Sequence, residues 1–355
     1  MVNPTCTLTA SSENKGSFRM ASASLKMPAI FCLHENYGET VAMLAKIREM
    51  NEKAYKATRK GRLKLRPSKI KWIDMSTTER IGPSAALALA SEFHRLHYLG
   101  QTSSTAIDIH RWKPEVIESL RQIGLLDILK ITSKSKKPLV NVGTTAILPL
   151  RSAKSVIGAE ADELNGEIAG IVSQIDFSDE LRSEVYDVLV EAMDNVATHA
   201  YPDNAVWAFT HAKAWWMTAA VNADERKLTV VIYDQGVSIP VRLPTWQNYY
   251  LADRLLQRLV SRFFGTRYEV SDRTKDGLVI RTAMKVAVTS TGKSYHGKGL
   301  PRMKAFIEKC RGGSLRILSR SGEYRFHKKD KVKSDKDLSH DVELGGTLIE
   351  WEVSY

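Results

Sequence analysis

The sequence predicts an α/β protein in two parts, and three observations support that class. Apolar residues recur at helical spacing in several stretches, of which IGPSAALALASEFHRLHYL (81–99) is the clearest. Short apolar runs bounded by turn residues, such as Leu228 to Tyr233, have the length of buried strands. The chain has 355 residues, which exceeds the usual limit of a single hydrophobic core. We therefore expect two α/β domains joined by a linker.

The N-terminal domain alternates helices and strands. From Thr40 to about Thr58 apolar residues recur at helical spacing, and KIKWIDMS (69–76) predicts a strand. In residues 81–99 a turn precedes the helix, and Pro83 stands at the first turn, where a helix tolerates proline. A further helix is expected from Pro114 to Gly124. The order of these elements is that of an α/β domain.

Two segments are expected to lie outside the domains. Residues 1–28 are rich in Ser, Thr and Asn and show little periodicity, which predicts a flexible leader. Residues 133–154 are basic and contain Pro138, Gly143 and Pro149. They predict a linker that can add one strand to a neighbouring sheet. The boundary between the domains is expected near residue 145.

The stretch EAMDNVATHAY (191–201) carries the clearest chemical signal. Glu191 and Asn195 stand four residues apart in a strongly helical run, so they share one helix face. An Asn oxygen is a hard ligand suited to Mg²⁺. A Glu can accept a proton from an attacking water. The pair therefore indicates a metal and a polarised water, while a solvated helix face would show the same spacing.

The buried strand Leu228–Tyr233 ends in a second candidate site. It is followed by Asp234 and Gly236. An acid at a strand end can accept a hydrogen bond from the exocyclic amine of a base, and the glycine permits a tight turn. An ordinary strand followed by a turn is the alternative interpretation.

Two glycine-rich segments complete the pattern. Gly297 and Gly299 open a helix that is expected to run to Lys309, and both the glycines and the helix N-terminus suit phosphate groups. Lys298 lies between them, where a cation would offset phosphate charge, although a solvated loop in a basic protein fits equally well. Near the C-terminus, the turn Gly345-Gly346-Thr347 opens the last strand, and the Thr hydroxyl could bridge to a purine through water.

In order, spacing and residue type, these four blocks resemble the N box, G1 box, G2 box and final Gly-Thr of the GHKL fold. That ATP-binding fold is shared by gyrase, the heat-shock chaperone, histidine kinases and mismatch-repair ATPases. The resemblance covers residues 155–355 and is closest to the anti-sigma-factor kinase branch. It implies an α/β sandwich in which Asn195 binds Mg²⁺, Glu191 is the catalytic base, and Asp234 and Thr347 hold adenine. The glycines of these boxes and Lys298 would line the triphosphate.

One position departs from this family pattern. The G1 box normally reads D-x-G-x-G, and Ser238 replaces its second glycine. If that position needs a positive φ, Ser costs about 1 kcal/mol or more in strain, which would weaken nucleotide binding or slow turnover. His199, one turn beyond Asn195, either reaches the nucleotide or caps the helix against Tyr201 and Pro202.

Residues 29–132 resemble the STAS domain of anti-sigma-factor antagonists. The similarity lies in a strand, a D-x-S turn, a small-residue helix and a helix ending in IGLLDIL. The family pattern at the helix start is D-S-S-G, and its first Ser takes phosphate in regulatory members. Here Gly82, Pro83, Ser84 and Ala85 occupy those positions. Proline cannot be phosphorylated, so Ser84, Ser76 or Thr77 would have to substitute, while a packing role for Ser84 is the alternative.

Composition limits the location and the partners. No apolar run approaches 18 residues and the start lacks a secretory signal, so we expect a cytoplasmic protein with no membrane span. The three cysteines are isolated, which predicts reduced thiols. The net charge of +12 implies an anionic partner. From Arg242 to Lys298 there are 11 Lys or Arg and 4 Asp or Glu, a net of +7, where the family places a mobile ATP lid. No recognised nucleic-acid motif accompanies this charge.

The sequence thus predicts an ATP-binding regulatory protein that uses Mg²⁺ and acts by partner switching. Whether the γ-phosphate passes to water or to a protein hydroxyl stays open, because Glu191 could activate either nucleophile. Two rival hypotheses are an ATP-gated nucleic-acid or defence-type machine, suggested by the basic lid, and a module that binds ATP without hydrolysis, suggested by Ser238. A protein partner and homo-oligomers are both compatible with the pattern.

Overall fold

The computed structural model describes residues 25–59, 73–99, 109–129, 145–147, 149–153, 178–222, 224–246, 249–289 and 299–354. Its N-terminal part, residues 25–129, is a mixed α/β unit. The elements are β1 (Leu25–Lys26), β2 (Ile30–Phe31), α1 (Tyr37–Arg59), β3 (Ile73–Asp74), β4 (Arg80–Ile81), α2 (Pro83–Tyr98), η1 (Ile109–Arg111), α3 (Pro114–Gln122) and α4 (Leu125–Ile128). The short strands pair in parallel, β1 with β3 and β2 with β4.

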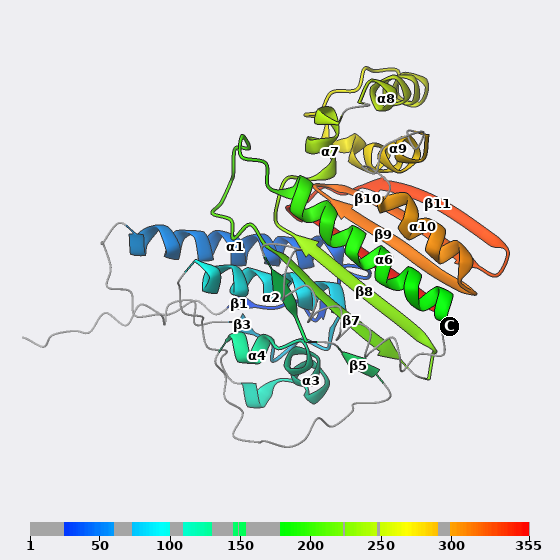
Figure 1. The fold of residues 1–355 in the computed structure, drawn as a ribbon. Coiled ribbons are helices and arrows are strands. Elements are labelled where there is room, and N and C mark those ends of the chain that lie inside the picture. The colour runs from blue at the N-terminus through cyan, green and yellow to red at the C-terminus, as the bar shows by residue number, and fades with distance from the viewer. Residues whose placement is uncertain are drawn as a thin grey trace, which may run out of the picture.

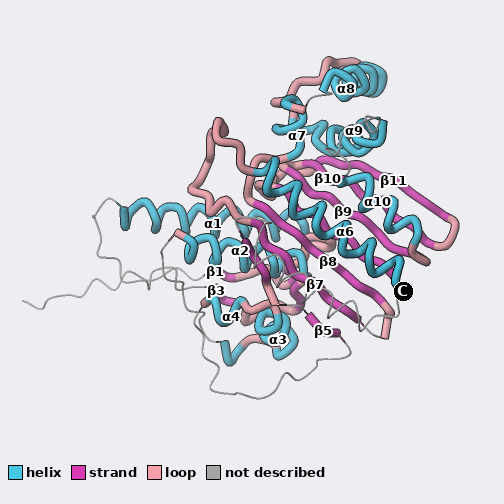
Figure 2. Tube along the Cα trace, in the orientation of Figure 1, coloured by secondary structure: helices cyan, strands magenta, loops and turns pink. Residues whose placement is uncertain are grey.

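The C-terminal part is built on one eight-stranded sheet, which Figures 1 and 2 show crossing the molecule diagonally. Its strands are β5 (Thr145–Ile147), β6 (Arg151–Ala153), β7 (Trp215–Asn222), β8 (Lys227–Asp234), β9 (Gly312–Ser319), β10 (Gly322–Lys329), β11 (Val332–Ser339) and β12 (Thr347–Ser354). The sheet order is β11-β10-β9-β12-β8-β7-β5, and β6 also pairs with β7. All of these pairings are antiparallel.

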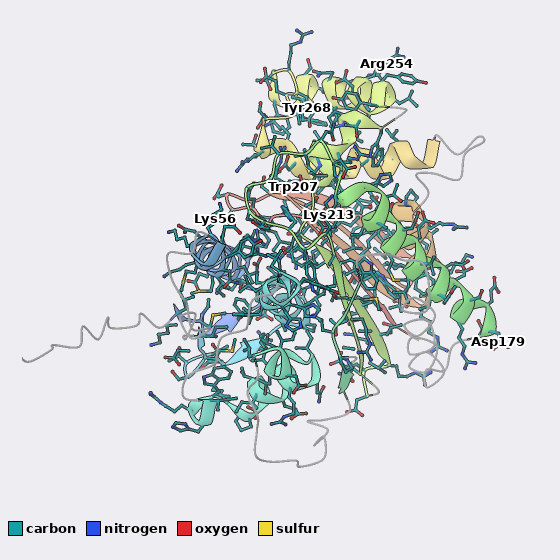
Figure 3. All side chains as sticks on the ribbon, turned by 60° about the vertical axis from the view of Figure 1, so that its left-hand side comes forward. Lys56, Asp179, Trp207, Lys213, Arg254 and Tyr268 are labelled. Carbon is teal, nitrogen blue, oxygen red and sulfur yellow. The ribbon has the colours of Figure 1, made fainter. Side chains whose placement is uncertain are left out.

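The helices of this part are α6 (Asp179–Asn195), the π-helical turn η2 (Val196–Ala200), α7 (Ile239–Arg242), η3 (Leu243–Thr245), α8 (Tyr249–Phe264), η4 (Arg273–Lys275), α9 (Asp276–Thr289) and α10 (Gly299–Lys309). In Figure 3 Arg254, on α8, lies at the top of the molecule, and Asp179, at the start of α6, lies at its right-hand side. Among the described residues, no helix is both long and apolar enough to cross a membrane.

Both faces of the sheet are covered, and the alternation along β8 shows how. Val230 and Ile232 join the core beneath α6 and α10, whereas Val231 and Tyr233 join the core formed with the N-terminal unit. Successive side chains of a strand point to opposite faces, so a continuous apolar run is what two buried faces require. The N-terminal unit therefore docks on the face of the sheet opposite α6 and α10.

This arrangement modifies the expected division of the chain. The described parts of the linker expected at 133–154 include two short strands, β5 and β6, where one was expected, and both pair with β7. The sheet thus begins at Thr145, close to the expected boundary. The two parts also share a hydrophobic core, which contains Leu44 and Phe93 from one part and Trp216 and Leu348 from the other. Two separate cores were expected from the chain length.

The basic stretch expected to form a mobile lid, 242–298, has a folded half. α9 packs on β10 and β11, and the buried carboxylate of Asp276 at its start accepts a 2.7 Å hydrogen bond from Arg320 Nε. A separate cluster joins α8 to α9, formed by Leu243, Ala252, Leu256, Val260, Tyr268, Val279, Ala283 and Val286. These contacts fix the position of α9 on the sheet, and the mobility expected for 242–298 stays a prediction.

Candidate functional site

Three polar side chains form a row across adjacent strands at one end of the sheet. Asp234, the last residue of β8, stands opposite Thr347, and Thr347 stands opposite Ser319 of β9. Directly opposite residues share a face of a sheet. In β8, Asp234 lies two residues from Ile232, which packs beneath α6 and α10, so the row faces those two helices.

One member of the row is a buried carboxylate, that of Asp234. Asp234 is 4% exposed, and one of its oxygens accepts a 2.8 Å hydrogen bond from the backbone N–H of Gly236. Burial raises the pKa of Asp234 to about 7, against hydrogen bonds from the backbone N–H groups of Gly236 and Thr347. The hydroxyls of Thr347 and Ser319 lie 2.8 Å apart, and Ser319 Oγ also accepts a hydrogen bond from the Ile239 N–H. Near pH 7 the carboxylate of Asp234 can therefore accept a hydrogen bond from a ligand amine.

Two glycines allow the backbone to close around Asp234. A Cβ atom at Gly236 would lie 2.2 Å from the carbonyl oxygen of Ala200. Gly346 has φ of +86°, and a Cβ atom there would lie 2.0 Å from the carbonyl oxygen of Asp234. Real Cβ atoms do not approach oxygen so closely, and a positive φ disfavours other residues. The glycines predicted from the sequence at these turns are thus needed for packing, whether or not phosphates bind.

The C-terminal end of α6 is fixed to the turn that follows β8. After Asn195 the helix widens into the π turn η2, and the Ala200 carbonyl at its end accepts a 2.7 Å hydrogen bond from Val237 N. The hydroxyl of Tyr201 accepts a 3.0 Å bond from Gln235 N and donates a 2.6 Å bond to the Ala214 carbonyl. π turns occur preferentially at functional sites. Here the turn brings the Asn195 end of α6 to the Asp234 end of β8.

Two ion pairs orient α10 beside α6. Arg302 Nη1 lies 3.4 Å from Glu191 Oε2, and Lys309 pairs with Glu184. Residue numbers rise along α10 as they fall along α6, so the helices are antiparallel. The N-terminus of α10, at Gly299, therefore lies at the same end of α6 as Asn195. In Figure 1 the two helices lie side by side across the sheet.

The structure thus brings together most of the residues that the sequence singled out. Glu191, Asn195, Asp234, Gly236, Thr347 and the start of α10 at Gly299 all belong to one end of the layer formed by α6, α10 and the sheet. Gly297 and Lys298 lie outside the described residues. The buried Nδ2 atom of Asn195 has no hydrogen-bond partner among the described residues.

Ser238 corrects one expectation. Its φ is −76° and its ψ is 160°, an ordinary extended conformation. The strain considered for a positive φ at this position is therefore absent. Ser238 precedes α7, and its carbonyl oxygen accepts a 2.9 Å hydrogen bond from Arg242 N. Replacement of the family glycine has no backbone penalty in this structure.

The fit of a magnesium ion can be judged from the donors present. Among the described residues, no group of three or more His, Cys, Asp or Glu side chains is placed to hold a metal. Mg²⁺ usually keeps several waters and binds through one or two protein oxygens together with substrate phosphates. The orphaned amide of Asn195 fits such a role, because the O and N of an amide can exchange places by a flip.

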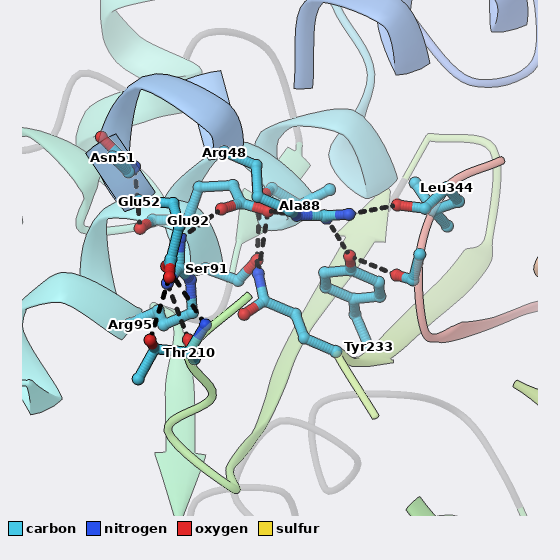
Figure 4. A network of polar contacts seen from close by, with 12 residues as sticks. Arg48, Asn51, Glu52, Ala88, Ser91, Glu92, Arg95, Thr210, Tyr233 and Leu344 are labelled. Carbon is cyan, nitrogen blue, oxygen red and sulfur yellow. Dashed lines mark hydrogen bonds and ion pairs between the residues drawn. The ribbon is translucent and has the colours of Figure 1, made fainter. Parts of the chain in front are cut away.

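A buried polar network that the sequence did not indicate connects the N-terminal unit to this site (Figure 4). Glu92 Oε1 accepts bonds from Arg48 Nε at 2.7 Å and from Gln235 Nε2 at 3.0 Å. Arg48 also donates to the Tyr233 hydroxyl at 3.0 Å, which in turn donates to the Gly345 carbonyl at 2.8 Å. Tyr233 and Gln235 are the chain neighbours of Asp234, and Gly345 precedes Thr347 by two residues, so the network ends beside two members of the row.

The same network continues along α1 and α2. Arg95 donates a 2.8 Å bond to the Thr210 carbonyl, and Thr210 donates two bonds to Glu52, from its N–H at 3.1 Å and its hydroxyl at 3.0 Å. Burial lowers the pKa of Arg48, and the neighbouring Glu92 more than offsets this, so the pKa of Arg48 is raised. The charged groups of this junction therefore compensate one another.

The phosphorylation candidates of the N-terminal unit differ in access. Ser84 is 1% exposed at the start of α2 and lies near the buried Glu350 of β12. His34 Nε2 lies 2.8 Å from Glu350 Oε1, on the face of the sheet opposite the row. A packing role for Ser84 fits this position, and modification would require the two parts to separate. Thr77 is exposed.

Comparisons with known proteins give no family assignment: no protein-family model matches the chain, and no curated protein matches it significantly.

Proposed function

We propose that the end of the layer formed by α6, α10 and the sheet binds ATP together with Mg²⁺. The observation that carries this proposal is the convergence of the row Asp234, Thr347 and Ser319 with Glu191 and Asn195 on α6. These residues come from distant parts of the chain. Their resemblance to the GHKL boxes supports the same function, and it assigns each residue a role that can be tested.

In this proposal Asp234 accepts a hydrogen bond from the adenine amine, with the Thr347 hydroxyl bridging through water. Asn195 supplies the protein oxygen to Mg²⁺, which would neutralise phosphate charge when bound. The N-terminus of α10 faces the phosphates with its free N–H groups. Glu191 accepts the proton of the attacking water or protein hydroxyl. Its present pairing with Arg302 is loose and partly exposed, so the carboxylate can be released.

The biological role we propose is regulatory. A nucleotide at this site would alter α7 and α8, which follow the Asp234 turn, and thereby change the surface offered to a protein partner. The N-terminal unit contacts the turns beside the row in two places: Glu92 accepts a bond from Gln235, and Arg48 donates a 3.1 Å bond to the Leu344 carbonyl. It thus contacts the nucleotide site from the opposite face of the sheet, in cis.

Calorimetry with ATP and Mg²⁺ tests the binding proposal. Asp234→Asn places an NH₂ group against the adenine amine, so we expect a loss of about 1–3 kcal/mol of binding free energy. Asn195→Ala should weaken binding in Mg²⁺ and have less effect in EDTA. Asp187→Asn is the control, because Asp187 is an exposed acid on the same helix. Unchanged ATP affinity in both site variants would contradict the proposal.

A second candidate function is ATP binding without turnover. The observation that favours it is that Arg302 pairs with Glu191, so the proposed base accepts a proton only if this pair opens. Release of phosphate and transfer of label to protein from γ-labelled ATP distinguish the two functions. Neither product forms if the site only binds.

A further inference from the structure

The outer surface of α8 carries groups that the ATP site does not use. The inner side of this helix packs against α9, where Ala252, Leu256 and Val260 are fully buried. Three large aromatic rings of α8 are exposed. Tyr250, which is 62% exposed, lies on the outer side, whereas Phe263 (67%) and Phe264 (52%) follow Leu256 and Val260 by seven and four residues and continue the inner side past the end of the packed region. α8 lies at the edge of the molecule, away from the N-terminal unit (Figure 1).

Three arginines form a stripe along this outer side. Arg254, Arg258 and Arg262 are exposed and follow one another at intervals of four residues, so they lie on one helix face over about 12 Å. None of them pairs with a carboxylate among the described residues. The only acid on α8 is Asp253, and its carboxylate accepts from the Tyr249 hydroxyl and Gln257 Nε2. The stripe is therefore uncompensated.

Such a stripe does not stabilise the helix. Like charges four residues apart destabilise a helix by about 0.2–0.5 kcal/mol for each pair. The basic hairpin of β10 and β11 differs, because several charges there are paired, including Lys333 with Glu308 and Arg281 with Asp337. The free charge on α8 is accordingly the better match for an external anion.

The aromatic rings select among anionic partners. The exposed ring of Tyr250 stands four residues before Arg254, so it continues the line of arginines on the same helix face. Exposed rings beside arginines are the combination that holds single strands, whose unstacked bases can stack on aromatic side chains. A duplex keeps its base faces covered. A membrane surface would take up the apolar face of an amphipathic helix, and that face of α8 is buried.

We propose that the outer side of α8 binds single-stranded nucleic acid, with Arg254, Arg258 and Arg262 contacting phosphates and Tyr250 stacking on a base. This proposal is independent of the ATP site. It gives a specific role to part of the excess positive charge. The sequence suggested nucleic acid only for the basic stretch 242–298 as a whole, and the structure narrows this to one exposed face of α8.

Fluorescence polarisation with a labelled oligo-dT and the full chain tests the proposal. The triple variant Arg254→Gln, Arg258→Gln, Arg262→Gln should bind at least roughly tenfold more weakly, and its log–log salt slope should fall by about 2, since each single-strand phosphate contact contributes about 0.7. Tyr250→Ala should weaken binding by roughly 5- to 150-fold. Circular dichroism should show both variants folded.

The control removes the same charge elsewhere. Lys329→Gln, Lys331→Gln, Lys336→Gln lies on the β10–β11 hairpin, whose tip is roughly 26 Å along the strands from the end that contacts α9. This variant should keep most of the affinity. Equal losses of oligonucleotide affinity in both triple variants would mean that binding depends on net charge alone, and would overturn the proposal. So would tighter binding to a duplex of the same length, or arginine-dependent binding to phosphatidylserine vesicles without oligonucleotide binding.

Discussion

The junction beneath the sheet and the end of α6 above it use the same kinds of polar residue with opposite outcomes. At the junction, Glu92 lies between two arginines and an amide, and its side chain is fully buried. At the end of α6, Glu191 has one loose partner and the Asn195 amide nitrogen has none among the described residues. Compensated polar groups hold a structure together, whereas uncompensated ones remain available to a ligand.

The largest expected effect tests the junction. Glu92→Ala leaves Arg48 and Arg95 buried without their shared carboxylate, which should reduce the free energy of unfolding by about 3–5 kcal/mol. Urea denaturation measures the loss. Glu49→Ala, which removes an exposed acid of α1, should leave the unfolding midpoint unchanged. Equal stability of the Glu92 variant would mean that the junction contributes little and that the contrast with α6 is false.

The second effect concerns the opposite region. Glu191→Gln should keep the protein folded and ATP bound, and slow γ-phosphate loss by roughly 10²–10⁴-fold, as expected for a lost general base. Single-turnover assays measure the rate, and Glu180→Gln, at the exposed start of α6, serves as the control. Unchanged turnover in this variant would mean that Glu191 serves only to pair α6 with α10.

The third prediction uses the buried acid of the row. The pKa of Asp234 rises from 3.8 to about 7 on folding, so the folded protein binds more protons than the unfolded one between these values. Its contribution to stability therefore falls as pH rises from about 4 to 7. Adenine binding needs the ionised acceptor, so ATP affinity should increase roughly tenfold from pH 6 to pH 8. Calorimetry at both pH values checks this, and Asp234→Asn gives the baseline for titration of the nucleotide itself.

The smallest effect sharpens the difference between α8 and α9. Asp276 and its bonds to Arg320 and Ser321 anchor α9, so its amides should exchange slowly with and without ATP and Mg²⁺. Amides of α8 and of the turn from Gly265 to Lys275 should become slower when nucleotide binds. Identical exchange of α8 in both states would indicate a fixed surface.

Local elements were largely predictable from the sequence. Pro83 begins α2, α10 ends at Lys309, and β8 contains the whole apolar run Leu228–Tyr233. Each of these depends on spacing and on residues that start or stop an element, which are local properties. Several candidate site residues could be chosen for the same reason, because Asn195 ends α6, Asp234 ends β8 and Thr347 begins β12, whereas Glu191 was chosen by its spacing from Asn195.

The long-range arrangement could not be predicted. The strand order places β12 between β8 and β9, and no spacing rule specifies that insertion. The apolar run of β8 indicated burial, but not that the N-terminal unit covers one of its faces. Arg48 and Glu92 are 44 residues apart, and Ser319 shares no motif with Thr347. Such contacts depend on the tertiary fold, which determines whether a charged residue becomes a structural or a functional one.

The shared core also determines how the chain can be divided in the laboratory. Trp216 and Tyr233 are fully buried between the sheet and the N-terminal unit. Expression of either part alone would uncover that apolar face, which favours self-association. The intact chain should melt in one calorimetric transition instead of two, and truncation near residue 145 should yield insoluble material. The shared core thus predicts that both regions unfold together as one cooperative unit.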